Sequence, residues 1–86
     1  MGRQTNQLNA FVCNHERTLF QGGCDALLVP TKRGEVALMP YHEPIILLLA
    51  KGKIQLVQGG ERSELCACEK GVARIDDNKA VIMVDL

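Results

Sequence analysis

Cysteine and histidine are the residue types in this chain of 86 residues that are best suited to metal or redox chemistry. Cys66 and Cys68 lie two positions apart, which places both thiols on one face if the segment is a strand. A tetrahedral zinc site needs two further ligands, and the remaining candidates are Cys13, Cys24, His15 and His42. Structural zinc sites usually have about two to four residues between paired cysteines, and cysteine is itself common in protein cores. The spacing therefore favours buried thiols, and we predict neither a metal nor a cofactor.

Nucleophilic catalysis has little support from the remaining residue types. Ser63, the single serine, lies in an alternating segment and is predicted to be an outward polar residue. A cysteine could approach a histidine in the folded chain, but no spacing indicates such a pair. The pairs Gly22-Gly23 and Gly59-Gly60 are isolated, and neither is followed by the helix that a phosphate-binding loop requires. We therefore predict that the chain is not an enzyme.

Charge and hydropathy exclude two further classes of partner. Ten lysines and arginines offset ten aspartates and glutamates, and only 3% of residues are aromatic, so no nucleic-acid surface is expected. The longest apolar run, residues 45–50, is far shorter than the roughly 20 residues that span a bilayer. Residues 1–9 are polar and do not resemble a signal peptide. We expect a cytoplasmic protein that does not insert directly into a membrane.

The elements that position these residues are predicted to be short strands joined by tight turns. Gly59-Gly60 is the strongest hairpin signal, because glycine supplies the positive φ angles of a two-residue turn. Gly22-Gly23 permits a bend or bulge, since glycine tolerates conformations that other residues avoid. No stretch shows helical apolar spacing behind a cap. We predict one all-β domain over residues 1–86, a small β-sandwich of about nine to ten short antiparallel strands. The predicted strands are residues 8–14, 17–20, 24–30, 35–39, 45–50, 53–58, 61–69, 72–75 and 80–86.

Two of these strands do not alternate between apolar and polar residues. Residues 45–50 and 81–84 are apolar on both faces, whereas a two-layer sandwich buries only one face of each sheet. Such strands indicate either a surface that meets a partner, or strands that the protein's own loops cover or that lie at a corner of the sandwich. Both alternatives are open at this point.

The loop at residues 40–44 is a second candidate for partner binding. Pro40 and Pro44 restrict the backbone around Tyr41, His42 and Glu43, which lowers the entropy lost on binding. The loop is therefore either a recognition element or only a connection between two strands, which the prolines end.

The order of the motifs follows a known family. The most specific match is residues 34–45, which contain the proline–histidine–proline loop. The other matching segments are residues 11–13, 16–22, 24–30, 49–56, 70–75 and 78–85. In this order they resemble the N-terminal β-sandwich of the epsilon subunit of bacterial rotary ATP synthases, called delta in mitochondria. Ala37 and Tyr41 replace two glycines usual in that family, and Lys70 precedes Gly71 where the family often has a second glycine. The sequence ends at Leu86, so the family's C-terminal helical hairpin is not expected.

The resemblance implies a non-catalytic subunit without an active site. It would bind the gamma subunit and the c-ring of a proton- or sodium-translocating ATP synthase and couple ion transport to ATP synthesis, peripheral to the inner face of the membrane. By the same resemblance, one end of the sandwich faces the ring and stalk and carries Arg33, Gly34, Glu35, Tyr41, His42 and Glu43. The alternative is a stand-alone interaction module that forms a homo-oligomer or binds an unrelated partner.

Overall fold

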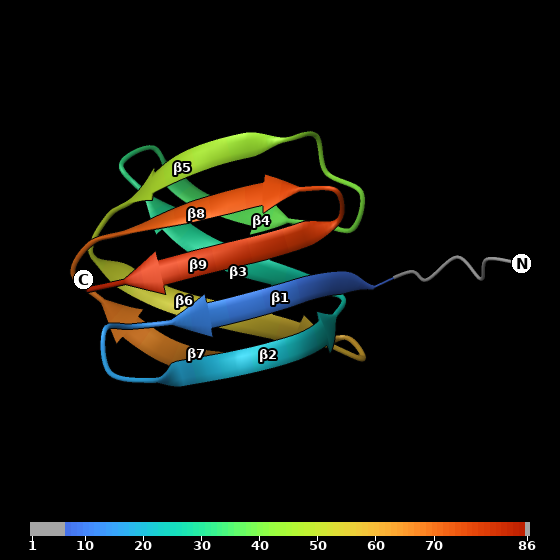
Figure 1. Cartoon of the computed structure of the whole chain (residues 1–86), viewed down its shortest axis with the longest axis horizontal. Helices are drawn as coiled ribbons and strands as arrows, with labels where there is room; N and C mark the ends of the chain where they lie inside the picture. Colours follow the sequence, from blue (N-terminus) through green and yellow to red (C-terminus); the bar gives the residue numbers. More distant parts are fainter. Residues whose placement is uncertain (1–6, 86) are drawn as a thin grey trace, which may run out of the picture.

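Branched aliphatic residues and regular turn signals produce nine strands in the computed structural model, which describes residues 7–85 (Figure 1). No helix occurs in this part of the chain, so the predicted all-β class is confirmed. The strands are β1 (Leu8–Cys13), β2 (Thr18–Cys24), β3 (Ala26–Thr31), β4 (Gly34–Leu38), β5 (Ile45–Leu49), β6 (Gly52–Gln58), β7 (Glu61–Cys68), β8 (Gly71–Asp76) and β9 (Lys79–Val84).

The strands form two stacked sheets, as the sandwich prediction requires (Figure 1). One sheet has five strands in the order β2-β1-β9-β8-β5, and the other has four in the order β4-β3-β6-β7. The expectation of antiparallel pairing is wrong for one pair, because β1 and β9 are parallel, with Asn9 opposite Lys79. Parallel neighbours cannot be joined by a tight turn. Here the chain between β1 and β9 forms the other seven strands, among them the whole four-stranded sheet.

Period-two alternation directs one side of each sheet into a shared core. In β1, Leu8, Ala10 and Val12 are buried, whereas Phe11 and Cys13 face outward, as the alternation predicts. The largest fully buried side chains come from both sheets and meet between them. They are Leu8, Leu27, Leu38, Ile54, Ile75, Ile82, Val12, Val29 and Val84, with Cys24.

Two-residue turns close the hairpins β6–β7 and β8–β9. Gly59 and Gly60 have φ angles of 61° and 83°, so the predicted glycine hairpin is confirmed. Asp77 and Asn78 have φ angles of 52° and 59° and form the equivalent turn between β8 and β9. Both turns therefore match the right-handed twist of the strands that they join.

The bend or bulge that Gly22-Gly23 permits does not form at these residues. Both glycines lie inside β2 and pair with Ala10 and Asn9 of β1. The chain leaves the five-stranded sheet at Asp25 instead, where the Asp25 N–H donates to the carbonyl oxygen of Val57 (3.0 Å) in the other sheet. Two glycines in a row permit a bend but do not require one.

Candidate functional site

The β4–β5 loop is a tight turn with a strained centre. The His42 N–H donates to the Met39 carbonyl oxygen (3.3 Å), so that Pro40 and Tyr41 occupy the two central positions. Proline suits the first of these, and the second adopts φ of 62° at Tyr41, where glycine is normally favoured. A side chain in this left-handed conformation costs about 1 kcal/mol. The strained residue nevertheless leaves 57% of its surface exposed to solvent.

Neighbouring groups hold the loop in this conformation. The Tyr41 N–H donates to the Oδ1 atom of Asn78 (2.8 Å), which belongs to the β8–β9 turn. The His42 Nδ1 atom lies 2.8 Å from the carbonyl oxygen of Glu43, within hydrogen-bonding distance. Sequence analysis missed Asn78, because no local signal relates a turn residue to a loop 37 positions away.

The β3–β4 turn carries the other three predicted site residues. The Thr31 hydroxyl donates to the Gly34 carbonyl oxygen (2.7 Å) and accepts from the Arg33 N–H (3.2 Å), which shapes the turn. The carboxylate of Glu35 pairs with the guanidinium of Arg62 on β7 (3.4 Å). Glu35 is therefore already engaged within the protein.

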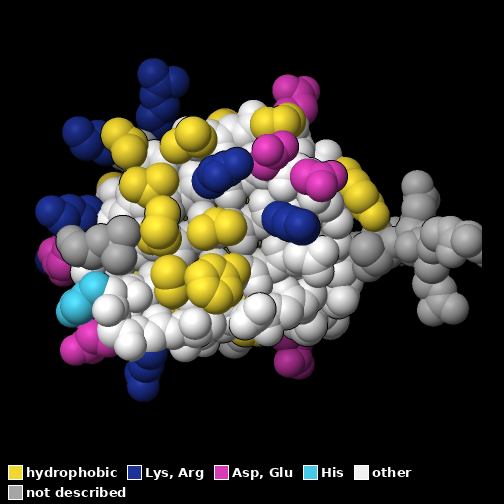
Figure 2. Space-filling view, in the orientation of Figure 1, with side chains coloured by type: hydrophobic (Ala, Val, Ile, Leu, Met, Phe, Trp, Pro, Cys, Tyr) yellow, Lys and Arg dark blue, Asp and Glu magenta, His cyan; other side chains and the backbone are white. Residues whose placement is uncertain are grey.

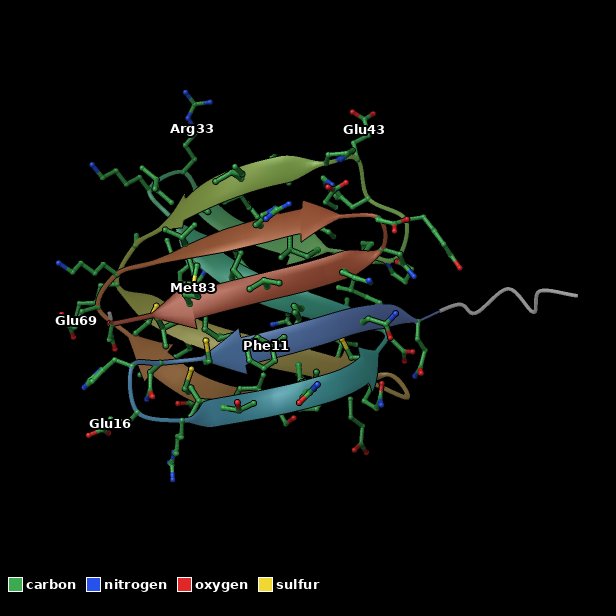
Figure 3. The ribbon with its side chains drawn as sticks, in the orientation of Figure 1. Phe11, Glu16, Arg33, Glu43, Glu69 and Met83 are labelled. Atoms are coloured by element: carbon green, nitrogen blue, oxygen red, sulfur yellow. The ribbon has the colours of Figure 1, made fainter. Side chains whose placement is uncertain are left out.

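The six predicted residues do not gather at one end of the sandwich, so that part of the prediction is wrong. Gly34 begins β4, and Tyr41 follows the opposite end of the same strand. Figure 3 shows Arg33 and Glu43 at the two ends of β5. Because β4 and β5 are the edge strands of their sheets, the residues occupy two corners of one edge. A role in partner binding stays a prediction for all six.

Part of the outer surface of the five-stranded sheet is apolar, and we call this part the apolar face (Figure 2). Strand register places its members on one side: Leu48 is opposite Val72, and Val72 is opposite Met83. Figure 3 shows Met83 and Phe11 on the same surface, on the neighbouring strands β9 and β1. The apolar face consists of Phe11, Cys13, Ile46, Leu48, Val72, Val81 and Met83.

Exposure on this face is highest along β5. Ile46 and Leu48 are 68% and 77% exposed, so the described loops do not cover them. Ion pairs lie on the outer sides of both sheets. The four-stranded sheet carries Arg62–Glu35 and Lys53–Glu64 (3.5 Å), and the five-stranded sheet carries Arg74–Asp76 (3.8 Å), with Arg74 opposite Ile46 and Val81. The predicted strands with two apolar faces are confirmed, and the alternative that loops cover them does not hold for the outward residues of β5.

Basic residues border one end of the apolar face. A shallow groove is lined there by the apolar Leu48, Val72 and Met83 and by the lysines Lys32 and Lys70. An apolar floor with cationic walls suits a partner segment that is apolar and ends in carboxylates.

The thiols on β7 are packing residues. Cys66 and Cys68 lie opposite Ile54 and Gly52 and share the inward side of the strand, as the spacing predicts. Burial is the main cause that raises the pKa of both thiols, and it does the same for Cys24, so all three favour the neutral form. Within residues 7–85, no group of three or more cysteine, histidine or acidic side chains is placed to hold a metal ion. The same residues contain no helix that is long and apolar enough to cross a membrane.

The family match and the similar protein sequences agree on one family. Residues 7–86 match the family described as "ATP synthase, Delta/Epsilon chain, beta-sandwich domain". The ATP synthase epsilon chain of Leptospira interrogans serovar copenhageni is 31% identical over 93% of this chain and 62% of that protein. The epsilon chain of Neisseria meningitidis strain MC58 is 33% identical over 87% of this chain and 54% of its own length. The chain thus spans less than two thirds of these relatives.

Comparison with solved structures shows the same fold. A chain in the cryo-EM structure of the Euglena gracilis mitochondrial ATP synthase, OSCP/F1/c-ring in rotational state 1, superposes with a TM-score of 0.84 at 21% identity. The match covers 96% of this chain and 53% of that one. A chain of the Tetrahymena thermophila mitochondrial ATP synthase central stalk and c-ring has a TM-score of 0.73 at 11% identity, over 96% and 66%.

Proposed function

This chain belongs to the ATP synthase delta/epsilon family, as its β-sandwich domain, and from that premise we propose that it is a non-catalytic subunit of an ATP synthase central stalk. In this role it binds a gamma-like stalk subunit and the c-ring, and so couples proton or sodium transport to ATP synthesis. Its position is peripheral, on the inner side of the membrane, and it is held there by these partners.

The apolar face carries the proposal. Monomeric proteins rarely expose a large contiguous apolar patch unless a partner covers it. Leu48 and Ile46 are mostly exposed, and the half-buried Val72, Val81 and Met83 extend the patch across the sheet. We assign this face to the stalk subunit. Lys32 and Lys70 would then meet carboxylates of that subunit at the border of the contact.

The β4/β5 edge is the proposed contact with the c-ring. Its two corners carry the polar groups of Arg33 and Glu43, together with the exposed Tyr41. The turn at Tyr41 is already held by hydrogen bonds, so docking against polar loops of the ring would order few groups. Backbone strain held at an exposed side chain is a feature of recognition sites.

A binding experiment with the purified chain tests the contact with the stalk subunit. The wild-type protein is expected to bind the gamma subunit of the same organism at micromolar concentration. Leu48→Asp places a charge on the apolar face and is expected to abolish that binding. Ala67→Asp is the matched control, because Ala67 is also exposed on an edge strand but belongs to the four-stranded sheet. Absence of wild-type binding, or equal losses in the two variants, contradicts the proposal.

One observation favours the alternative of a self-associating module. β5 is an edge strand whose residues are all Ile or Leu, without the charge or proline that protects most sheet edges. Two copies could pair along β5 and form a homo-oligomer. Sedimentation at concentrations up to the millimolar range distinguishes the two functions, since a strict monomer argues against self-association.

A further inference from the structure

Three segments far apart in the sequence meet at the side chain of Asn78. Its Oδ1 atom accepts a hydrogen bond from the Tyr41 N–H (2.8 Å) in the β4–β5 loop. Its Nδ2 atom donates to the carbonyl oxygen of Gln7 (2.9 Å), the residue just before β1. The backbone carbonyl of Asn78 accepts from the Asn9 N–H (3.1 Å). One residue therefore links the loop, the first strand and the β8–β9 turn.

Asparagine meets three requirements at this position. Its φ of 59° lies in the left-handed region, which asparagine, aspartate and glycine tolerate best. The Tyr41 N–H needs an acceptor, and the Gln7 carbonyl needs a donor. A carboxamide supplies both in one orientation, whereas a carboxylate supplies only acceptors and glycine supplies neither.

The Tyr41 bond matters because the loop is strained at the same residue. The φ of 62° at Tyr41 is unfavourable for a side-chain-bearing residue, so contacts from outside the loop must hold it. The His42–Met39 bond lies within the loop and is long, at 3.3 Å. Asn78 supplies a shorter bond, at 2.8 Å, from the β8–β9 turn.

We propose that Asn78 is a positioning residue, which fixes the β4–β5 loop so that Tyr41 is presented to the partner. The consequence for binding rests on the proposed function. The anchoring of the loop does not, because it can be measured on the isolated chain.

Three variants test the anchoring. Asn78→Gly keeps the left-handed turn but removes both side-chain hydrogen bonds. Asn78→Asp keeps the acceptor for Tyr41 and removes only the donor to Gln7. Asp77→Gly is the matched control, because Asp77 has a φ of 52° in the same turn and its side chain forms no hydrogen bond or ion pair identified within residues 7–85. Unchanged far-ultraviolet circular dichroism establishes that each variant folds.

Amide hydrogen exchange measured by NMR is the first measurement, without any partner. Exchange at the Tyr41 N–H is expected to rise about tenfold in Asn78→Gly, since one hydrogen bond is lost. It should change less than about threefold in Asn78→Asp and in Asp77→Gly. Unchanged exchange in Asn78→Gly, or an equal rise in Asp77→Gly, overturns the anchoring role.

Affinity for the detergent-solubilised c-ring is the second measurement. Asn78→Gly is expected to weaken binding about five- to tenfold, and Asn78→Asp is expected to retain it, because the charged acceptor still holds Tyr41. Equal affinities of Asn78→Gly and the wild type overturn the positioning role. A wild-type chain that does not bind the ring, with exchange that changes as expected, refutes the proposed function and leaves the anchoring by Asn78 in place.

Discussion

Leu48 and Leu49 are adjacent on β5 but face opposite sides of the sheet, which allows a sharp test of the apolar face. Leu48 is 77% exposed, whereas Leu49 is 6% exposed and belongs to the core. We predict that Leu48→Ala weakens binding to the stalk subunit with little effect on folding. Leu49→Ala, the same chemical change, should reduce stability instead.

The expected sizes follow from exposure. Full burial of a leucine side chain contributes about 1.5–3 kcal/mol. Docking can bury the exposed three quarters of Leu48, so its truncation should cost about 1–2 kcal/mol of binding, or about five- to thirtyfold in Kd. The free energy of unfolding should fall by less than about 0.5 kcal/mol. Truncation of Leu49 removes buried methyl groups and leaves a cavity, so unfolding should become about 2–5 kcal/mol easier.

Urea denaturation monitored by circular dichroism measures stability, and surface plasmon resonance with immobilised gamma subunit measures binding. The reasoning is refuted if Leu48→Ala destabilises the fold as much as Leu49→Ala, since the side chain would then be buried. It is also refuted if Leu48→Ala binds with wild-type affinity, since the partner would then avoid this face.

Three further predictions concern strain, close packing and titration. Tyr41→Gly should raise the free energy of unfolding by about 0.5–1 kcal/mol, because it relieves the left-handed strain, and should weaken c-ring binding; a loss of stability in thermal melts would contradict this. Gly71→Ala should lower stability by about 2 kcal/mol, because a Cβ there would lie 2.6 Å from the Met83 carbonyl oxygen; an unchanged melting temperature would show that β8 and β9 can separate. The pKa values of the Cys24, Cys66 and Cys68 thiols are raised in the folded chain, so as pH rises these thiols lose their protons in the unfolded chain before they do in the folded one. Their ionisation should therefore leave the free energy of unfolding unchanged below about pH 9 and should lower it at higher pH. Denaturation titrations from pH 7 to 10.5 check this, and a cysteine-free variant should show a smaller decline.

Local patterns predicted most of the fold. The alternation in β1 identified its buried face, and Gly59-Gly60 identified a hairpin, because both signals depend on neighbouring residues alone. The parallel pairing of β1 with β9 was not predictable in this way, because it depends on the path of the whole chain. The conformation of Gly22-Gly23 was not predictable for a related reason: pairing with β1 keeps the segment extended, although its local freedom permits a bend.

The candidate site was predicted in part. The two-sided apolar character of β5 was visible in the sequence, but its exposure depended on which sheet edge the strand occupies. The prolines marked the loop around Tyr41. The separation of Arg33 from Glu43 follows from the length of β4 and was not anticipated. Asn78 acts across two turns and gave no local signal.

The parallel contact between β1 and β9 also has a consequence for biosynthesis. Asn9 leaves the ribosome early but pairs with Lys79, so the five-stranded sheet cannot close until nearly all of the described chain has emerged. Until then β1 and β2 form only a hairpin, which is marginally stable alone in water. Pairing between strands so distant in sequence also slows folding, because a long loop must be ordered first. The nascent chain therefore exposes the aliphatic residues of β5 from their emergence until β8 and β9 follow and pair.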